Sequence, residues 1–235
     1  MTALRSFLAT TAVLSMAVVS PFSVTPLPAD EKDFDRFNEA ATVFTEIMDA
    51  PDKGIPQELM ESARCIVIVP GLKKGAFIVG AKFGKGFLSC RQKGTGKWSA
   101  PGAVRVEGGS VGFQIGGSET DVVLLVMNSR GADRLLSSQF TLGGEGEVAA
   151  GPVGRSATAQ TDAKLTAEIL SWSRSRGVFA GVSLQGATLR EDEEANQALY
   201  GKKLKNREIV EMSMRPPRGA EHLLALLNRY SRRDK

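Results

Sequence analysis

Four lysines and three phenylalanines occur together in one short segment that we expect to form two strands and a turn. They are Lys73, Lys74, Lys82 and Lys85, with Phe77, Phe83 and Phe87. On a shared surface, ammonium groups can meet headgroup phosphates while rings enter the acyl boundary of a membrane. The alternative is that phenylalanines at alternate strand positions belong to the core. The four lysines are our first candidates for contact with anionic lipid.

Three arginines further along the chain are candidates for the same chemistry. Arg155 follows the segment GPVG, and Arg174 and Arg176 lie in WSRSRG. A guanidinium can donate two parallel hydrogen bonds to a phosphate. Solvated surface arginines are an equally good interpretation, and the sequence leaves both open.

The glycine-rich stretch GFQIGGSETDVVLLVMN, residues 112–128, does not match a nucleotide-binding loop. A Walker A loop has Lys and then Ser or Thr after its last glycine, whereas Ser118 and Glu119 follow Gly117. The second stretch, GGEGEVAAG, places two glutamates where a pyrophosphate would approach. We expect the glycines to permit tight turns and close strand packing, and Thr120–Asp121 to fix the entry of a buried strand.

Residues suited to catalysis or to metal binding are scarce. His222 is the single histidine, so a Ser/His/Asp site or a histidine metal site would have to be built around it. The carboxylates of residues 191–194 are consecutive, so they point around a helix and favour its amino terminus. Cys65 and Cys90 do not have the spacing of a metal site. We expect no enzymatic activity, no cofactor and no metal.

The two cysteines leave one question open. Cys65 lies in the apolar run CIVIV, and buried free thiols are common in proteins. An oxidising compartment would equally permit a disulfide between Cys65 and Cys90.

The amino terminus indicates export. Arg5 precedes an apolar run from Phe7 to Val19, which is typical of a secretory signal peptide and short for a membrane span. We expect residues 1–29 to be a signal peptide and residues 30–235 to form one domain, periplasmic or secreted and peripheral to a membrane. The net charge of +4 favours anionic surfaces but is far below that of nucleic-acid-binding proteins.

Periodicity places helices at both ends of the chain. Apolar residues recur every three or four positions from Lys32 to Asp49, which predicts an amphipathic helix, and PQELMESA predicts a short second one. Further helices are expected over residues 131–138 and 191–200, in NREIVEM with Asn206 as its cap, and in HLLALLNRY.

Between these helices, short runs of strand-forming residues alternate with glycines. The runs are CIVIVPG, ended by Pro70–Gly71, then AFIVGAKF, GFLSCRQ, AVRVEGG, SVGFQIG, VVLLVMN, SATAQTDAKLTAEILSWS and GVFAGVSLQGATL. VVLLVMN is apolar at consecutive positions, so we expect it to be covered on both faces. Together they predict an α+β fold: a glycine-rich antiparallel sheet, or a partly open barrel or sandwich, with flanking helices at both ends.

Six segments, taken in order, resemble the SYLF domain family. They are RCIVIVPG, KKGAFIVGAKFGKG, KWSAPGAV, GFQIGGSETDVVLLVMN, residues 151–189 and NQALYGK. The resemblance extends from Phe37 to Tyr230. Ser118 stands where relatives commonly have Gln, and Trp172 where Tyr is usual.

The resemblance implies a lipid-binding module. Eukaryotic relatives bind phosphoinositides, are often coupled to an SH3 domain and regulate actin, whereas bacterial relatives are typically exported, as expected here. The membrane-binding amphipathic segment of the eukaryotic relatives would correspond to residues 32–49, whose periodicity packing on the sheet explains equally well. Our hypothesis is an envelope protein that contacts anionic phospholipid or phosphoinositide headgroups. The alternative is a structural or interaction protein that forms homo-oligomers through exposed sheet edges.

Overall fold

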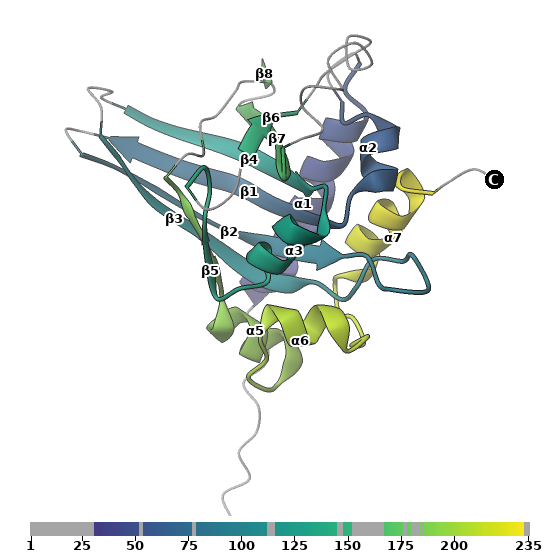
Figure 1. The fold of residues 1–235 in the computed structure, drawn as a ribbon. Helices are drawn as coiled ribbons and strands as arrows, with labels where there is room; N and C mark the ends of the chain where they lie inside the picture. Colours follow the sequence, from purple (N-terminus) through teal and green to yellow (C-terminus); the bar gives the residue numbers. More distant parts are fainter. Residues whose placement is uncertain are drawn as a thin grey trace, which may run out of the picture.

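The strands expected in the middle of the chain pair into one sheet, which curls into a half-barrel among helices (Figure 1). The structure is a computed structural model that describes residues 31–51, 54–76, 79–111, 116–144, 148–151, 167–175, 178–179, 184 and 186–232. The predicted signal peptide lies outside the described residues.

Nine strands form the sheet within the described residues. They are β1 (Cys65–Ala76), β2 (Val79–Cys90), β3 (Gly102–Val111), β4 (Gly116–Val126), β5 (Gln139–Thr141), β6 (Val148–Ala150), β7 (Ile169–Ser175), β8 (Val178–Phe179) and β9 (Thr188–Glu191). Their order is β5-β9-β3-β2-β1-β4-β7-β6, with β8 also paired to β7. Only β6 and β7 are parallel among these pairs. The predicted α+β fold with an antiparallel, partly open sheet is confirmed.

The amphipathic helix predicted from Lys32 to Asp49 is confirmed as α1. Its side chains Phe37, Phe44 and Ile47 are fully buried, and Phe37 stacks on Phe87 of β2 with ring centroids 3.9 Å apart. Packing against the sheet therefore explains the periodicity. None of the described helices is long and apolar enough to cross a membrane. The described helices are α1 (Glu31–Met48), α2 (Gln57–Ser62), α3 (Ser129–Leu135), α5 (Glu193–Tyr200), α6 (Asn206–Glu211) and α7 (Glu221–Tyr230).

The sheet separates two layers of buried side chains. Along β4, Val123 and Leu125 pack with α1 and α7, whereas Val122, Leu124 and Val126 pack with α3, β5 and β9. Because consecutive strand residues point to opposite faces, a strand covered on both sides must be apolar at every position. The prediction for VVLLVMN is confirmed.

Pro70 and Gly71 bend β1 without ending it. We predicted that the strand stops here, but it continues to Ala76 with a shift of register against both neighbours. Gly71 adopts a φ of 56°, and its N–H donates to the Asp121 carboxylate at 3.0 Å. The prediction was wrong because a proline-glycine pair is compatible with a β-bulge as well as with a turn.

A close backbone approach lies on β2, opposite this bulge. A Cβ on Gly86 would lie 2.0 Å from the carbonyl oxygen of Ile68, and one on Gly84 would lie 2.8 Å from side-chain carbons of β1. A Cβ on Gly117 would meet only the Lys74 carbonyl oxygen, at 4.0 Å. The close packing that we predicted for the glycines before β4 therefore occurs at Gly84 and Gly86.

Three further predictions differ from the structure. AFIVGAKF is divided between β1 and β2, and GFLSCRQ continues β2, so these runs belong to one hairpin. GVFAGVSLQGATL contains two short strands, β8 beside β7 and β9 beside β3. Asn206 does not cap α6, because Lys205 holds that position and the Asn206 side chain donates to the Ala103 carbonyl. Of the long strand predicted in residues 156–173, the structure describes β7 alone.

A disulfide joins the two cysteines, which settles the question that the sequence left open. Cys65 and Cys90 are direct cross-strand partners at one end of the β1–β2 pair, and they are 25 residues apart in the chain. Register alone brings them together, so the bond depends on the hairpin that forms between them.

Reduction of this disulfide is expected to lower the free energy of unfolding by about 3 kcal/mol, because the unfolded chain then regains the freedom of a closed loop. Urea denaturation with and without a phosphine reductant measures the difference. A Cys65→Ala/Cys90→Ala variant is the control and should not respond to the reductant. Two titratable thiols in the unreduced wild-type protein would contradict the expectation.

Gly86→Ala is expected to lower the free energy of unfolding by about 2 kcal/mol or more, because its Cβ would collide with the backbone of β1. Gly117→Ala is the matched control, since that Cβ enters open space and should change stability by less than about 1 kcal/mol. Urea denaturation followed by circular dichroism compares the two. Equal midpoints for both variants would show that the close approach does not constrain the sheet.

Candidate anion-binding sites

One end of the sheet extends past the helices. Figure 1 shows the neighbouring ends of β1, β2, β3 and β4 projecting beyond α1 and α7. We call this end the overhang; its described residues lie from Lys73 to Phe83 and from Glu107 to Glu119. Lys73 and Phe83 are cross-strand partners there, both are exposed, and Phe83 is 49% exposed. The overhang thus presents a cation beside an uncovered ring.

A hollow of about 680 Å³ opens at the overhang. It is lined by Lys73, Lys74, Gly75, Gly117, Ser118, Glu119, Asp121 and Arg174. Three of these side chains are cationic and two are carboxylates. Its net charge is therefore only weakly positive, and we expect any attraction of anions to come from Lys73, which is exposed, and from Lys74, which is half-buried.

The structure does not bring the four predicted lysines to one surface. Lys73 pairs with Phe83 on one face of the sheet, whereas Lys74 pairs with Lys82 on the other, because adjacent strand residues alternate. Lys82 is only 6% exposed. Its burial, followed by the charge of Lys74, lowers the pKa of Lys82. Contact with a headgroup in this conformation is open to Lys73 and Lys74 but not to Lys82.

Lys85 is held by an ion pair. Its Nζ lies 2.8 Å from Oδ2 of Asp192, whose side chain is almost fully buried. Asp192 is also the amino-terminal cap of α5, since its carboxylate accepts from the Ala195 N–H. The pair therefore fixes the start of α5 to β2.

The run of carboxylates from 191 to 194 is divided between a strand and a helix. Glu191 ends β9 and accepts from the N–H of Asn206, whereas Glu193 and Glu194 lie in the first turn of α5. Burial raises the pKa of Glu191, although the hydrogen bond opposes this effect. The predicted placement at a helix amino terminus is confirmed for Asp192, Glu193 and Glu194, and is wrong for Glu191.

The Arg174 guanidinium binds two carboxylates of the protein itself. Its Nη2 bonds Glu46 of α1 and lies 3.1 Å from Asp121 of β4. Burial opposes the charge, but these two hydrogen bonds outweigh it and raise the pKa of Arg174. Arg174 thus ties α1 to the sheet. The other two predicted arginines, Arg155 and Arg176, lie outside the described residues.

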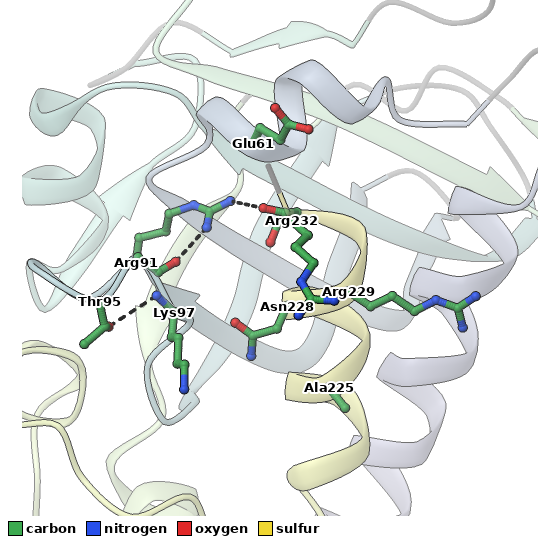
Figure 2. A pocket seen from close by; sticks show the side chains of 10 residues that line it. Glu61, Arg91, Thr95, Lys97, Ala225, Asn228, Arg229 and Arg232 are labelled. Atoms are coloured by element: carbon green, nitrogen blue, oxygen red, sulfur yellow. Dashed lines mark hydrogen bonds between the residues drawn. The ribbon is translucent and has the colours of Figure 1, made fainter. Parts of the chain in front are cut away.

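A second hollow, of about 750 Å³, lies between the β2–β3 turn and the carboxyl end of α7 (Figure 2). We call it the α7 hollow. It is lined by Glu61, Arg91, Thr95, Gly96, Lys97, Ala225, Asn228, Arg229, Ser231 and Arg232. Four of these side chains are cationic and one is a carboxylate. Our sequence analysis missed it, and the only sequence feature that points to it is the basic density of KGTGK and RYSRR.

Arg91 joins pieces of chain that are far apart in the sequence. Its guanidinium donates to the carbonyl oxygens of Met60, Ala63 and Ser231 at 2.9, 3.1 and 3.4 Å, and to that of Gly96 at 2.7 Å. Ala63 and Ser231 are the carboxyl-terminal caps of α2 and α7. A cation at a helix carboxyl terminus satisfies carbonyls that lack an intrahelical partner. Arg91 therefore fixes two helix ends and the turn together.

Trp98 closes the same junction from the turn. Its Nε1 donates to the Leu227 carbonyl at 3.1 Å and to the Ser231 hydroxyl at 2.8 Å. The Arg91 guanidinium carbon lies 4.8 Å from the centre of the indole ring. The walls of the α7 hollow are thus held in place by hydrogen bonds.

Two observations concern residues suited to catalysis or to metal binding. His222 is exposed on α7. In the part of the chain that the structure describes, no three His, Cys, Asp or Glu side chains lie close enough together to hold a metal ion.

Comparison with known proteins identifies the family. The model of the Ysc84 family, described as Las17-binding protein actin regulator, matches residues 107–230, more than half of the chain. The chain belongs to this family. The predicted resemblance to SYLF proteins is thereby confirmed.

Curated relatives of this Ysc84-family chain are longer than it is. SH3 domain-containing YSC84-like protein 1 of Homo sapiens is 34% identical over 212 residues, which cover 88% of this chain and 61% of the relative. The same protein of Xenopus laevis is 32% identical over 213 residues, 88% of this chain and 62% of the relative. LAS seventeen-binding protein 3 of Saccharomyces cerevisiae is 36% identical over 180 residues, 75% of this chain and 39% of the relative.

Arg91→Lys is expected to lower the free energy of unfolding by about 2 to 4 kcal/mol, because an ammonium group cannot reproduce the planar set of bonds to four carbonyls. Arg232→Lys, at the exposed rim of the same hollow, is the control and should change stability by less than about 0.5 kcal/mol. Thermal and urea unfolding measure both. An Arg91→Lys protein as stable as the control would show that Arg91 is not needed at the junction.

Proposed function

We propose that this Ysc84-family chain is a non-enzymatic module that binds anionic lipid headgroups with the overhang of its sheet. The observation that carries the proposal is the exposed pair of Lys73 and Phe83 on strands that the helices leave uncovered. Lysine stems lie along apolar surface while their ammonium groups remain in water, and a ring beside them can enter the headgroup region.

Exposure of Phe83 supports a contact surface. Phe83 and Met212 are the only large apolar side chains with high exposure among the described residues. Phe83 has one cationic neighbour on its own face of the sheet, Lys73 across the strand pair. An exposed ring next to a cation suits a membrane whose surface is anionic.

Export is part of the same proposal. The apolar amino terminus favours secretion, and the disulfide between Cys65 and Cys90 is a bond that persists in oxidising compartments. We infer a periplasmic or secreted protein that lies on a membrane surface. The alternative of a homo-oligomer joined at sheet edges receives less support, because the described edge strands β5 and β6 have three residues each.

Lys73→Glu/Lys74→Glu is expected to weaken binding to phosphatidylglycerol, cardiolipin and phosphoinositide vesicles by about tenfold or more, since each lysine near an anionic surface contributes about 1 kcal/mol. Co-sedimentation of the chain without the predicted signal peptide, residues 30–235, with these vesicles and with neutral ones measures the change. Phe83→Ser should weaken the binding that remains at high salt.

Lys202→Glu/Lys203→Glu is the matched control, because it reverses the same charge at two adjacent exposed lysines after α5. Met212→Ser is the corresponding control for Phe83. If the two charge-reversed proteins bind vesicles equally weakly, the attraction is non-specific and the overhang is not the site. Wild-type oligomers in light scattering, without selective lipid binding, would favour the interaction protein.

A further inference from the structure

We propose that the α7 hollow is a second anion site, which binds a phosphate group that carries two negative charges. The proposal rests on the placement of Lys97 and Arg232 on opposite walls of the hollow, and it is independent of the overhang. Figure 2 shows Lys97 on the side of the β2–β3 turn and Arg232 on the side of α7.

The cations of the hollow divide into two kinds. Arg91 donates to backbone carbonyls and serves the junction. The side-chain nitrogens of Lys97 and Arg232 have no hydrogen-bond acceptor and no ion-pair partner among the described residues. Arg229 extends away from the turn in Figure 2, so it does not share their role. Two uncompensated cations thus face one volume.

The negative groups near the hollow are one carboxylate and two helix carboxyl ends, and each has a hydrogen-bond donor. The only carboxylate in its lining is Glu61, which accepts from Gln57 at 3.1 Å. The carboxyl ends of α2 and α7 would repel an anion, but Arg91 bonds their terminal carbonyls and supplies a full positive charge beside them. An anion that enters therefore meets Lys97 and Arg232, with Arg91 offsetting the negative ends of the two helices.

The hollow is also preorganised. The hydrogen bonds of Arg91 and Trp98 fix the turn against α7, so the backbones that carry Lys97 and Arg232 need no rearrangement on binding. A site with fixed walls loses less entropy when a ligand binds. A compact, doubly charged group such as a phosphomonoester suits a hollow lined by two such cations better than the single charge of a phosphodiester does.

Trp98 provides a local reporter for the test. The chain has two tryptophans, and the Trp98 indole N–H bonds Ser231 in the wall of the hollow, whereas Trp172 is buried in the core. Pyrophosphate is titrated into the full exported chain, and the two indole signals are followed in a nitrogen–proton correlation spectrum. We expect a saturable shift of the Trp98 signal alone. A second arm uses vesicles of phosphatidic acid, a phosphomonoester lipid, against phosphatidylglycerol.

Lys97→Glu/Arg232→Glu is expected to weaken pyrophosphate binding by at least tenfold for each cation removed. Lys93→Glu/Arg218→Glu is the control, since both residues are exposed and lie outside the lining of the hollow, and it should bind as the wild type does. Both side chains of the test variant are exposed, so it should fold, and circular dichroism checks this.

The outcomes separate the sources of the phosphate. A Trp98 shift with pyrophosphate supports a soluble ligand, and one with phosphatidic acid vesicles alone supports a lipid headgroup, provided that Lys97→Glu/Arg232→Glu abolishes it. No shift with either probe, or equal loss in the Lys93→Glu/Arg218→Glu control, overturns the proposal. Lys73 and Lys74 do not line the α7 hollow, so Lys73→Glu/Lys74→Glu leaves that hollow intact. Failure of the overhang proposal would therefore not affect the pyrophosphate titration.

Discussion

The architecture depends on a difference in length between the long central strands and the part of the sheet that the helices cover. The strands β1 to β4 are 10 to 12 residues long, but helices cover the sheet only over the part where its side chains are apolar. The change occurs at the bulge of Pro70 and Gly71, before which β1 reads CIVIV and after which it carries Lys73 and Lys74. A covered strand must be apolar on both faces, whereas an uncovered one has to be soluble on both. The overhang follows from that change.

The other end of the sheet is organised by buried polar contacts instead of by strand length. Arg91 bonds the terminal carbonyls of α2 and α7, and Trp98 bonds α7 from the same turn. Lys85 and Asp192 fix α5 in a similar way. These contacts leave Lys97 and Arg232 without partners among the described residues. A fold by itself does not specify a function, so the two cationic regions are the features from which function has to be argued.

Local sequence patterns are enough to predict some of the helices and strands of this fold. The periodicity of residues 32–49 and the apolar run VVLLVMN predict their elements well, because burial on one or two faces imposes a pattern on the residues themselves. Glycine and proline are less informative about where a strand ends. Pro70–Gly71 forms a bulge where we expected an end, and Gly84 lies inside β2 where we expected a break between two strands.

The sequence by itself determined the family, the α+β class, the helices at both ends and a set of candidate lysines. Only the tertiary structure decided which cations are free to act. Lys82 and Lys85 are close in sequence to Lys73, yet strand register buries one and pairs the other with a carboxylate. Lys97 and Arg232 are distant in sequence, yet the junction at Arg91 brings them to one hollow. The reason is physical: a charge acts through its neighbours and its exposure, and both are set by chain segments that the local sequence does not specify.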